Sequence, residues 1–294
     1  MSDTPIDVFI DLPSFPGPVQ AGRLWSHFRK GRESASFEYN KEWLANPHRF
    51  ALEPLLPLAD GTFHTNPGQS VFGAIGDSTP DRWGRILMRR AELARARTAN
   101  ESPHTLSELD YLLRVSDEAR QGALRFSQDG GQSFCAPPGS TPIPPLVNLS
   151  RLLHAADHFC RDDENAEDLR LLLAPGSSLG GARPKASVKD KKGNLCIAKF
   201  PRYDDEYNVV AWEAVALTLA SKAGLQVPRF EQEKITDKDV LIVWRFDRTR
   251  EQRRISYLSA MSMLGARDNE QHSYLEIVDA IRQYGLYLIP ISEP

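Results

Sequence analysis

Residues 174–188 read Ala-Pro-Gly-Ser-Ser-Leu-Gly-Gly-Ala-Arg-Pro-Lys-Ala-Ser-Val, a glycine-rich turn between apolar segments. Glycine accepts backbone angles that other residues avoid, so the amide groups of such a turn can approach an anion closely. The turn fits neither the Walker A pattern nor Gly-x-Gly-x-x-Gly. By itself it is therefore compatible with a phosphate-binding loop and with an ordinary surface loop.

A lysine and a glutamate follow this turn within apolar surroundings. Residues 195–200 alternate as a strand does, and Lys199 continues their apolar face. Residues 207–222 have helical periodicity and place Glu213 on an apolar face, where a carboxylate needs a cation. Lys199 either extends into solvent at the strand end or pairs with Glu213. A glycine turn, a strand lysine and a helix glutamate, in this order, are the nucleotide-holding parts of a protein-kinase N-lobe.

The same residues resemble one family of bacterial kinases. Residues 177–185 (SSLGGARPK) are similar to the phosphate-loop signature of the HipA family of Ser/Thr kinases, the toxins of HipA–HipB toxin–antitoxin pairs. The resemblance continues through IAKFP around Lys199 and VWRFDR at residues 243–248. In the first half of the chain, the segments that resemble the small N-terminal subdomain of HipA proteins are residues 42–47, 72–87 and 121–126.

This resemblance implies roles for individual residues. Lys199 would contact the phosphates of ATP, and Glu213 would orient that lysine. Ser178 falls where HipA-type kinases autophosphorylate a serine and so silence the enzyme; alternatively, it is a turn serine that only hydrogen-bonds the backbone. The residues expected to hold the nucleotide are Ser177, Ser178, Gly180, Gly181, Ala182, Lys185, Lys199, Glu213, Val243, Arg245, Phe246 and Asp247, the last four around the adenine and partly through backbone groups.

The resemblance also implies catalytic residues that we do not find. HipA proteins use a catalytic loop similar to Asp-Asp-His-x-x-Asn and a later Asp to accept the substrate proton and to hold Mg²⁺. The sequence reaches residues 286–294 (LYLIPISEP) before any such loop. We therefore expect no catalytic or metal-binding residue here and no phosphoryl transfer, as in a truncated kinase or pseudokinase. Two explanations of this ending compete: a frameshift or early stop in a once-complete gene, and a short form that uses a partner to cover the exposed face. The abrupt tail favours the first.

Two functions follow from the resemblance. A complete HipA kinase transfers the γ-phosphoryl group of MgATP to a serine of a translation-related protein, such as an aminoacyl-tRNA synthetase. A helix-turn-helix antitoxin similar to HipB restrains it and binds operator DNA, so we expect DNA contact only through the antitoxin. The alternative is a non-catalytic binding module that docks on an antitoxin or on a full-length kinase. The N-terminal part supports this alternative because it can fold around its own apolar segments.

Composition limits the class of protein. The 294 residues carry a net charge of −3 and are 41% hydrophobic, which argues against a broadly cationic nucleic-acid binder and against a disordered chain. We see neither a secretory leader nor an apolar run long enough for a membrane span. Three isolated cysteines, Cys135, Cys160 and Cys196, are typical of a reduced cytosolic protein. We therefore expect a cytoplasmic protein without membrane contact.

We predict an α+β fold in which a small HipA-type subdomain precedes a kinase-like N-lobe, with the C-terminal helical lobe largely missing. A Pro/Gly/Ser-rich linker at residues 127–146 divides the subdomain, residues 1–126, from the partial kinase domain, residues 147–294. Strands are expected at residues 8–12, 23–28, 36–39, 122–126, 195–200 and 239–246. One helix is expected to run from about residue 80 into the basic segment at residues 92–100. Further helices are expected at residues 106–115, 149–160, 167–173, 207–222 and 273–284.

Overall fold

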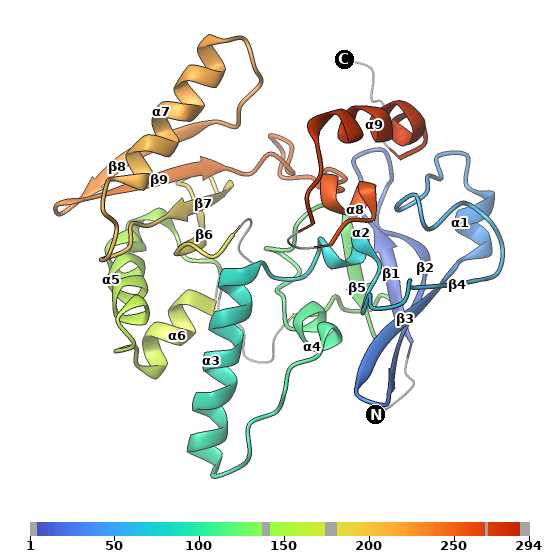
Figure 1. The fold of residues 1–294 in the computed structure, drawn as a ribbon, viewed down its shortest axis with the longest axis horizontal. Helices are drawn as coiled ribbons and strands as arrows, with labels where there is room; N and C mark the ends of the chain where they lie inside the picture. The colour runs from blue at the N-terminus through green and yellow to red at the C-terminus, as the bar shows by residue number, and fades with distance from the viewer. Residues whose placement is uncertain (1–4, 137–141, 174–180, 268–269, 289–294) are drawn as a thin grey trace.

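The described residues form two antiparallel sheets, one from each half of the chain, with helices around them (Figure 1). The computed structural model describes residues 5–136, 142–173, 181–267 and 270–288. The mixed architecture confirms the predicted α+β class. No helix in these ranges is long and apolar enough to cross a membrane.

The first sheet has the strand order β4-β3-β2-β1-β5. Lys30 and Gly31 both have positive φ angles, 50° and 75°, so they form a two-residue turn whose twist suits the hairpin between β2 and β3. The core of this half is rich in aromatic side chains, including the fully buried Phe37, Trp43 and Phe126. The elements are β1 (Ile6–Ile10), β2 (Val19–Arg29), β3 (Arg32–Tyr39), β4 (Thr62–His64), β5 (Leu124–Ser127), α1 (Lys41–Ala45), α2 (Gly73–Gly76) and α4 (Glu108–Leu113).

The second sheet has the strand order β6-β7-β9-β8, and helices cover both of its faces. On one face, Val240 and Ile242 of β9 pack in a core with residues of α5 and α6; on the other, Leu241 and Val243 pack against α7. Alternation along β9 thus assigns each helix layer to its own face. The elements are α5 (Leu149–Cys160), preceded by the 3-10 turn η1 (Leu146–Asn148), and α6 (Ala166–Leu173), β6 (Lys185–Lys189), β7 (Leu195–Lys199), α7 (Val209–Lys222), β8 (Phe230–Ile235) and β9 (Lys238–Trp244).

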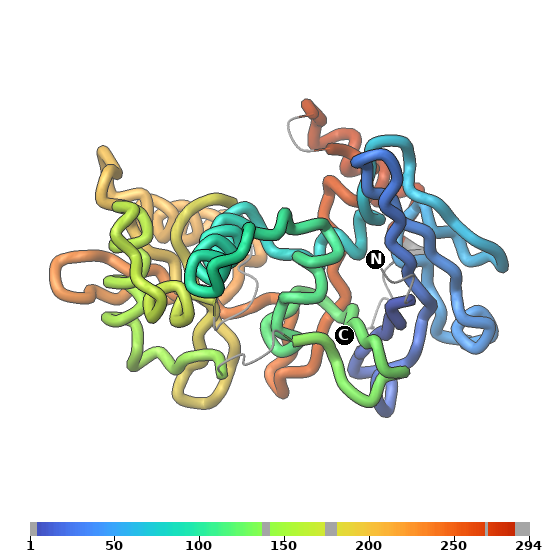
Figure 2. Tube along the Cα trace, turned by 90° about the horizontal axis from the view of Figure 1, so that it is seen from below, coloured from blue at the N-terminus to red at the C-terminus, as the bar shows by residue number. Residues whose placement is uncertain are grey.

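Helix α3 (Arg82–Ala99) comes from the first half of the chain but packs with the second sheet. Trp83 and Leu87 of α3 are buried in the core that contains α5 and α6, and the rings of Trp83 and Phe159 lie 5.0 Å apart, edge to face. Both views place α3 between the two sheets (Figures 1 and 2). The two halves of the sequence therefore share one of their cores.

After β9 the chain returns to the first half and forms α8 (Ala260–Leu264) and α9 (Tyr274–Leu288). Asp77, at the end of α2, accepts hydrogen bonds from the Ser259 amide at 2.6 Å and from the Ser262 hydroxyl at 3.0 Å. Helices α2 and α8 approach so closely that a Cβ atom on Gly73 would lie 2.8 Å from the Cβ of Ser262. Glycine at position 73 makes this contact possible.

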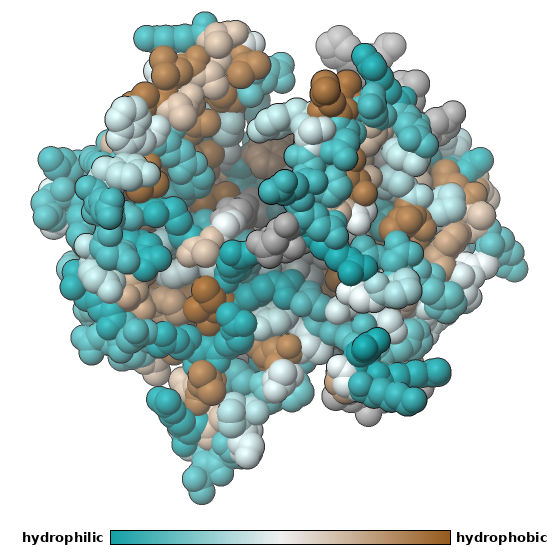
Figure 3. Space-filling view, viewed as in Figure 1, coloured by the Kyte–Doolittle hydropathy of each residue, from teal (hydrophilic) through white to brown (hydrophobic). Residues whose placement is uncertain are grey.

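Apolar side chains remain exposed on the outer helices. Figure 3 shows a brown area over α7, and the exposed residues there include Trp212, Val215 and Leu219. Helix α9 is longer than predicted, and it exposes Tyr274, Leu275, Val278 and Ile281.

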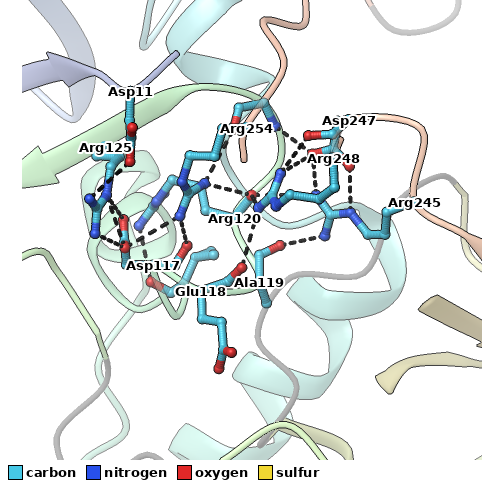
Figure 4. Close-up of polar contacts among 12 residues, drawn as sticks. Asp11, Asp117, Glu118, Ala119, Arg120, Arg125, Arg245, Asp247, Arg248 and Arg254 are labelled. Carbon is cyan, nitrogen blue, oxygen red and sulfur yellow. Dashed lines mark hydrogen bonds and ion pairs between the residues drawn. The ribbon is translucent and has the colours of Figure 1, made fainter. Parts of the chain in front are cut away.

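A buried group of arginines joins the segment after β9 to the loop before β5 (Figure 4). Asp247 is fully buried and accepts hydrogen bonds from the Arg245 Nε atom at 2.6 Å, the Arg248 Nη1 atom at 2.7 Å and the Gly122 amide at 2.8 Å. Arg245 and Arg248 also donate to the carbonyls of Ala119, at 2.6 Å, and Arg120, at 2.8 Å. These carbonyls and the Asp247 carboxylate replace the water that buried guanidinium groups need.

We expect Asp247→Asn to lower the free energy of unfolding by about 3 kcal/mol in urea denaturation at pH 7, because it leaves buried arginines without their counter-charge. Burial disfavours the charged carboxylate, but Arg245 and Arg248 outweigh it and lower the pKa of Asp247. A carboxylate with a lowered pKa stabilises the fold above the unfolded value near 4 and loses that contribution as the pH falls further. The wild type should therefore lose more stability than the variant below about pH 4.

The exposed Asp60 supplies the control: Asp60→Asn should change the free energy of unfolding by less than about 0.5 kcal/mol. Equal stability of wild type and Asp247→Asn at pH 7 would contradict the proposed importance of this buried charge.

Candidate functional site

Lys199 and Glu213 form an ion pair between the last residue of β7 and the second turn of α7. The pairing predicted from the sequence is present. The predicted burial of Glu213 is wrong, because α7 buries Val210 and Ala214, and the Glu213 side chain lies at the edge of that face with 38% of its area exposed. The Lys199 side chain is 28% exposed. The pair is thus held by the fold and is still open to a ligand from solvent.

A second lysine lies directly opposite the first. In the β6–β7 pairing, Lys185 faces Lys199 across the ladder, so both side chains are on the α7 face of the sheet. The Lys185 side chain is only 3% exposed, and its Nζ atom donates to the Asp81 carboxylate at 2.9 Å and to the Gly181 carbonyl at 3.0 Å. Burial lowers the pKa of Lys185, and the Asp81 carboxylate opposes that effect. Each lysine has its own carboxylate, which makes the close approach of two cations tolerable.

The described end of the glycine-rich turn leads into these lysines. Gly181 has a φ angle of +64°, and its carbonyl accepts hydrogen bonds from the Lys185 ammonium group and from the Trp83 amide. Gly181 and Ala182 are both exposed. Three further residues predicted at the site, Ser177, Ser178 and Gly180, lie outside the described residues.

The residues predicted around the adenine separate into two groups. Val243 pairs with Ile197 in the sheet and packs under α7, and Phe246 is 56% exposed, with its ring 5.7 Å from that of Tyr257. The side chains of Arg245 and Asp247 are committed to the buried arginine group. A contribution of these two residues to a ligand would therefore come through their backbone atoms.

Sequence reasoning missed two residues at this site, Asp81 and Trp83. Asp81 is the N-cap of α3, since its Oδ1 atom accepts from the Gly84 amide at 2.9 Å. The sequence predicted a helix start near Pro80, but the contact of this start with residues 181–185 depends on tertiary packing. Among the described residues, no group of three or more His, Cys, Asp and Glu side chains is arranged to hold a metal ion.

We expect Glu213→Gln to lower the free energy of unfolding by no more than about 1 kcal/mol, because ion pairs with exposed partners contribute little to stability. The neighbouring truncation Val210→Ala, which removes fully packed methyl groups, should cost about 2 kcal/mol. Urea denaturation of both variants measures the contrast. A larger loss for Glu213→Gln than for Val210→Ala would mean that the pair is chiefly structural.

Two family models match this chain, and both describe HipA domains. The model for the HipA N-terminal domain matches residues 17–127, and the model for the HipA-like C-terminal domain matches residues 177–288. No curated protein matches the sequence at a significant level. Among solved structures, the chain matches one from the Shewanella oneidensis MR-1 toxin–antitoxin complex of HipA, HipB and operator DNA, with 18% identity and a TM-score of 0.49.

That match covers 93% of this chain and 60% of the solved chain, so this chain spans about three-fifths of the length of the structure it matches. The two family models together account for most of the sequence, on both sides of the Pro/Gly/Ser-rich segment. The chain therefore belongs to the HipA family.

Proposed function

We propose that this chain binds ATP on the α7 face of the second sheet, as the nucleotide-holding part of a HipA-like Ser/Thr protein kinase. The observation that carries the proposal is the Lys199–Glu213 ion pair between a strand and the helix that follows it. In protein kinases an ion pair of this kind positions the lysine on the nucleotide phosphates. Membership of the HipA family supports the same assignment.

The charges around the pair suit a triphosphate. Lys185 and Lys199 are on the same face, and the exposed Gly181 lies beside them, since its carbonyl accepts a hydrogen bond from the Lys185 ammonium group. Lysine is a common phosphate ligand in proteins, and glycine turns offer backbone amides to phosphate oxygens. In this proposal Glu213 orients Lys199, residues 243–247 contact the adenine through their backbone, and Mg²⁺ arrives with the nucleotide.

In this proposal, phosphoryl transfer belongs to complete HipA kinases. A complete kinase would phosphorylate a serine of a translation-related protein, such as an aminoacyl-tRNA synthetase. A HipB-like antitoxin would restrain that kinase and connect it to DNA. Residues 1–294 contain no sequence of the Asp-Asp-His-x-x-Asn type. We therefore propose that these residues, acting alone in the cytoplasm, bind nucleotide without transferring its phosphoryl group.

We expect calorimetric titration with MgATP to show binding that Lys199→Ala weakens at least about 10-fold, because a charge-assisted contact to phosphate is lost. Lys234→Ala, on an exposed position of β8, is the matched control and should bind as the wild type does. Absence of ATP binding to the folded wild type would refute the proposal.

Intact mass spectrometry after incubation with MgATP tests the second part of the proposal. We expect no added phosphoryl group on the wild type. A phosphoryl group that appears on the wild type and is absent from both Ser178→Ala and Lys199→Ala would show that residues 1–294 are catalytically competent.

A second candidate function is a docking module for an antitoxin or for a full-length kinase. The N-terminal half favours it because its sheet encloses an aromatic core of its own. Expression in bacteria separates the two candidates: a growth effect that depends on nucleotide binding disappears with Lys199→Ala, whereas an effect due to docking persists in that variant.

A further inference from the structure

Asp81 connects the N-terminal half of the chain to the proposed nucleotide site. It lies at the start of α3, and its two carboxylate oxygens have different partners: Oδ1 caps the helix at the Gly84 amide, and Oδ2 accepts from the Lys185 ammonium group at 2.9 Å. The Asp81 and Lys185 side chains are 11% and 3% exposed. A buried cation beside an ionised carboxylate is a directed contact, since the charge-assisted hydrogen bond fixes the position of the ammonium group.

Trp83, two residues after Asp81, donates hydrogen bonds to both ends of the segment 181–185. Its backbone amide donates to the Gly181 carbonyl at 3.2 Å, and its indole Nε1 atom donates to the Lys185 carbonyl at 2.9 Å. The Trp83 side chain is itself buried against Phe159. The start of α3 therefore holds residues 181–185 by backbone and side-chain contacts together.

The charge of Lys185 depends on its surroundings. The charged groups that face it are Asp81 from α3, Lys199 from β7 and Glu213 from α7. Burial lowers the pKa of Lys185 and Lys199 lowers it further, whereas Asp81, and more weakly Glu213, raises it. Without the carboxylate of Asp81, burial and the neighbouring Lys199 would favour the neutral amine, which is a poor partner for phosphate.

We propose that Asp81 is a positioning residue for the phosphate side of the nucleotide site, where it keeps Lys185 protonated and fixed on the face that Lys199 shares. The N-terminal half then supplies part of the site and is more than an attached docking module. This inference rests on the proposed binding of ATP and adds a residue from outside the second sheet to it.

Asp81→Asn removes the carboxylate from Lys185 and retains the helix cap, because asparagine is as good an N-cap as aspartate. Affinities for ATP and for adenosine are measured from pH 6 to pH 10 in the wild type, in Asp81→Asn and in the control Glu108→Gln. Glu108 also pairs with an arginine of α3, Arg85, but does not contact Lys185. Thermal unfolding of each protein confirms that it is folded over this range.

We expect the affinity for ATP to fall as the pH rises. The midpoint of this fall should lie at least one pH unit lower in Asp81→Asn than in the wild type. The reason is that loss of a neighbouring carboxylate lowers the pKa of a lysine, so Lys185 loses its proton at a lower pH. Adenosine, which has no phosphate, should bind both proteins equally at each pH. Asp81→Glu, which retains a carboxylate, should move the midpoint back toward the wild-type value, and Glu108→Gln should leave it unchanged.

Two outcomes would overturn the inference while leaving the proposed function intact: superimposable ATP profiles for wild type and Asp81→Asn, or an equal loss of affinity for ATP and adenosine. The second would indicate a purely structural role. Failure of the wild type to bind ATP at any pH would refute the proposed function and this inference with it. Asp81→Ser, another good N-cap without charge, replaces Asp81→Asn if the amide variant does not fold.

Discussion

The buried carboxylate of Asp247 is the interaction on which the arrangement of the two sheets depends. It balances two guanidinium groups in a region without solvent, and those groups in turn hold the carbonyls of the loop before β5. The residues joined in this way are more than 120 positions apart in the sequence. Because the desolvation of two arginines is costly, the group stabilises the protein only when all of its members are in place. It therefore fixes where β9 ends relative to the first sheet.

Helix α3 makes the second connection between the halves, and this connection reaches the candidate site. Its apolar side, with Trp83 and Leu87, belongs to the core of the second sheet, and its first turn contacts residues 181–185. The two lysines on the α7 face are thus supported from different directions. Lys199 is held by a helix of its own half, and Lys185 by a helix of the other. The sheets of the two halves differ in strand number and order, but both halves supply a carboxylate that pairs with a lysine of the site.

Local patterns predicted much of this structure. Alternation identified β7 and the face of Lys199, helical periodicity identified α5 with its observed ends, and together they paired Lys199 with Glu213. The prediction that Glu213 is buried was wrong. Helix α7 is apolar around most of its circumference, so periodicity alone could not identify the buried side of the helix. Strand β8 was missed because it is an edge strand of exposed polar residues, without the apolar alternation that marks a half-buried strand.

The features that the sequence did not predict are mainly long-range contacts. Nothing near Asp81 in the sequence indicates a lysine 104 positions later. Likewise, nothing in the motif at residues 243–248 indicates that the side chains of Arg245 and Asp247 form a buried ion pair. The resemblance to HipA proteins correctly identified the family, which residue patterns alone left open. Residues 177–180 remain predicted as a phosphate-binding loop, because the described structure begins again at Gly181.

The sharing of α3 has a consequence for how this protein can be divided. The match to the N-terminal family model ends at residue 127, and a cut there would carry α3 away with the first sheet. Trp83 and Leu87 would then face water, and α5 and α6 would lose the surface that covers them. The Pro/Gly/Ser-rich segment after residue 127 is the clearest boundary in the sequence. A cut there would nevertheless not give two parts that each keep a complete core. A chimera that exchanged the first 127 residues with those of a relative would have to bring along a matching partner for Phe159.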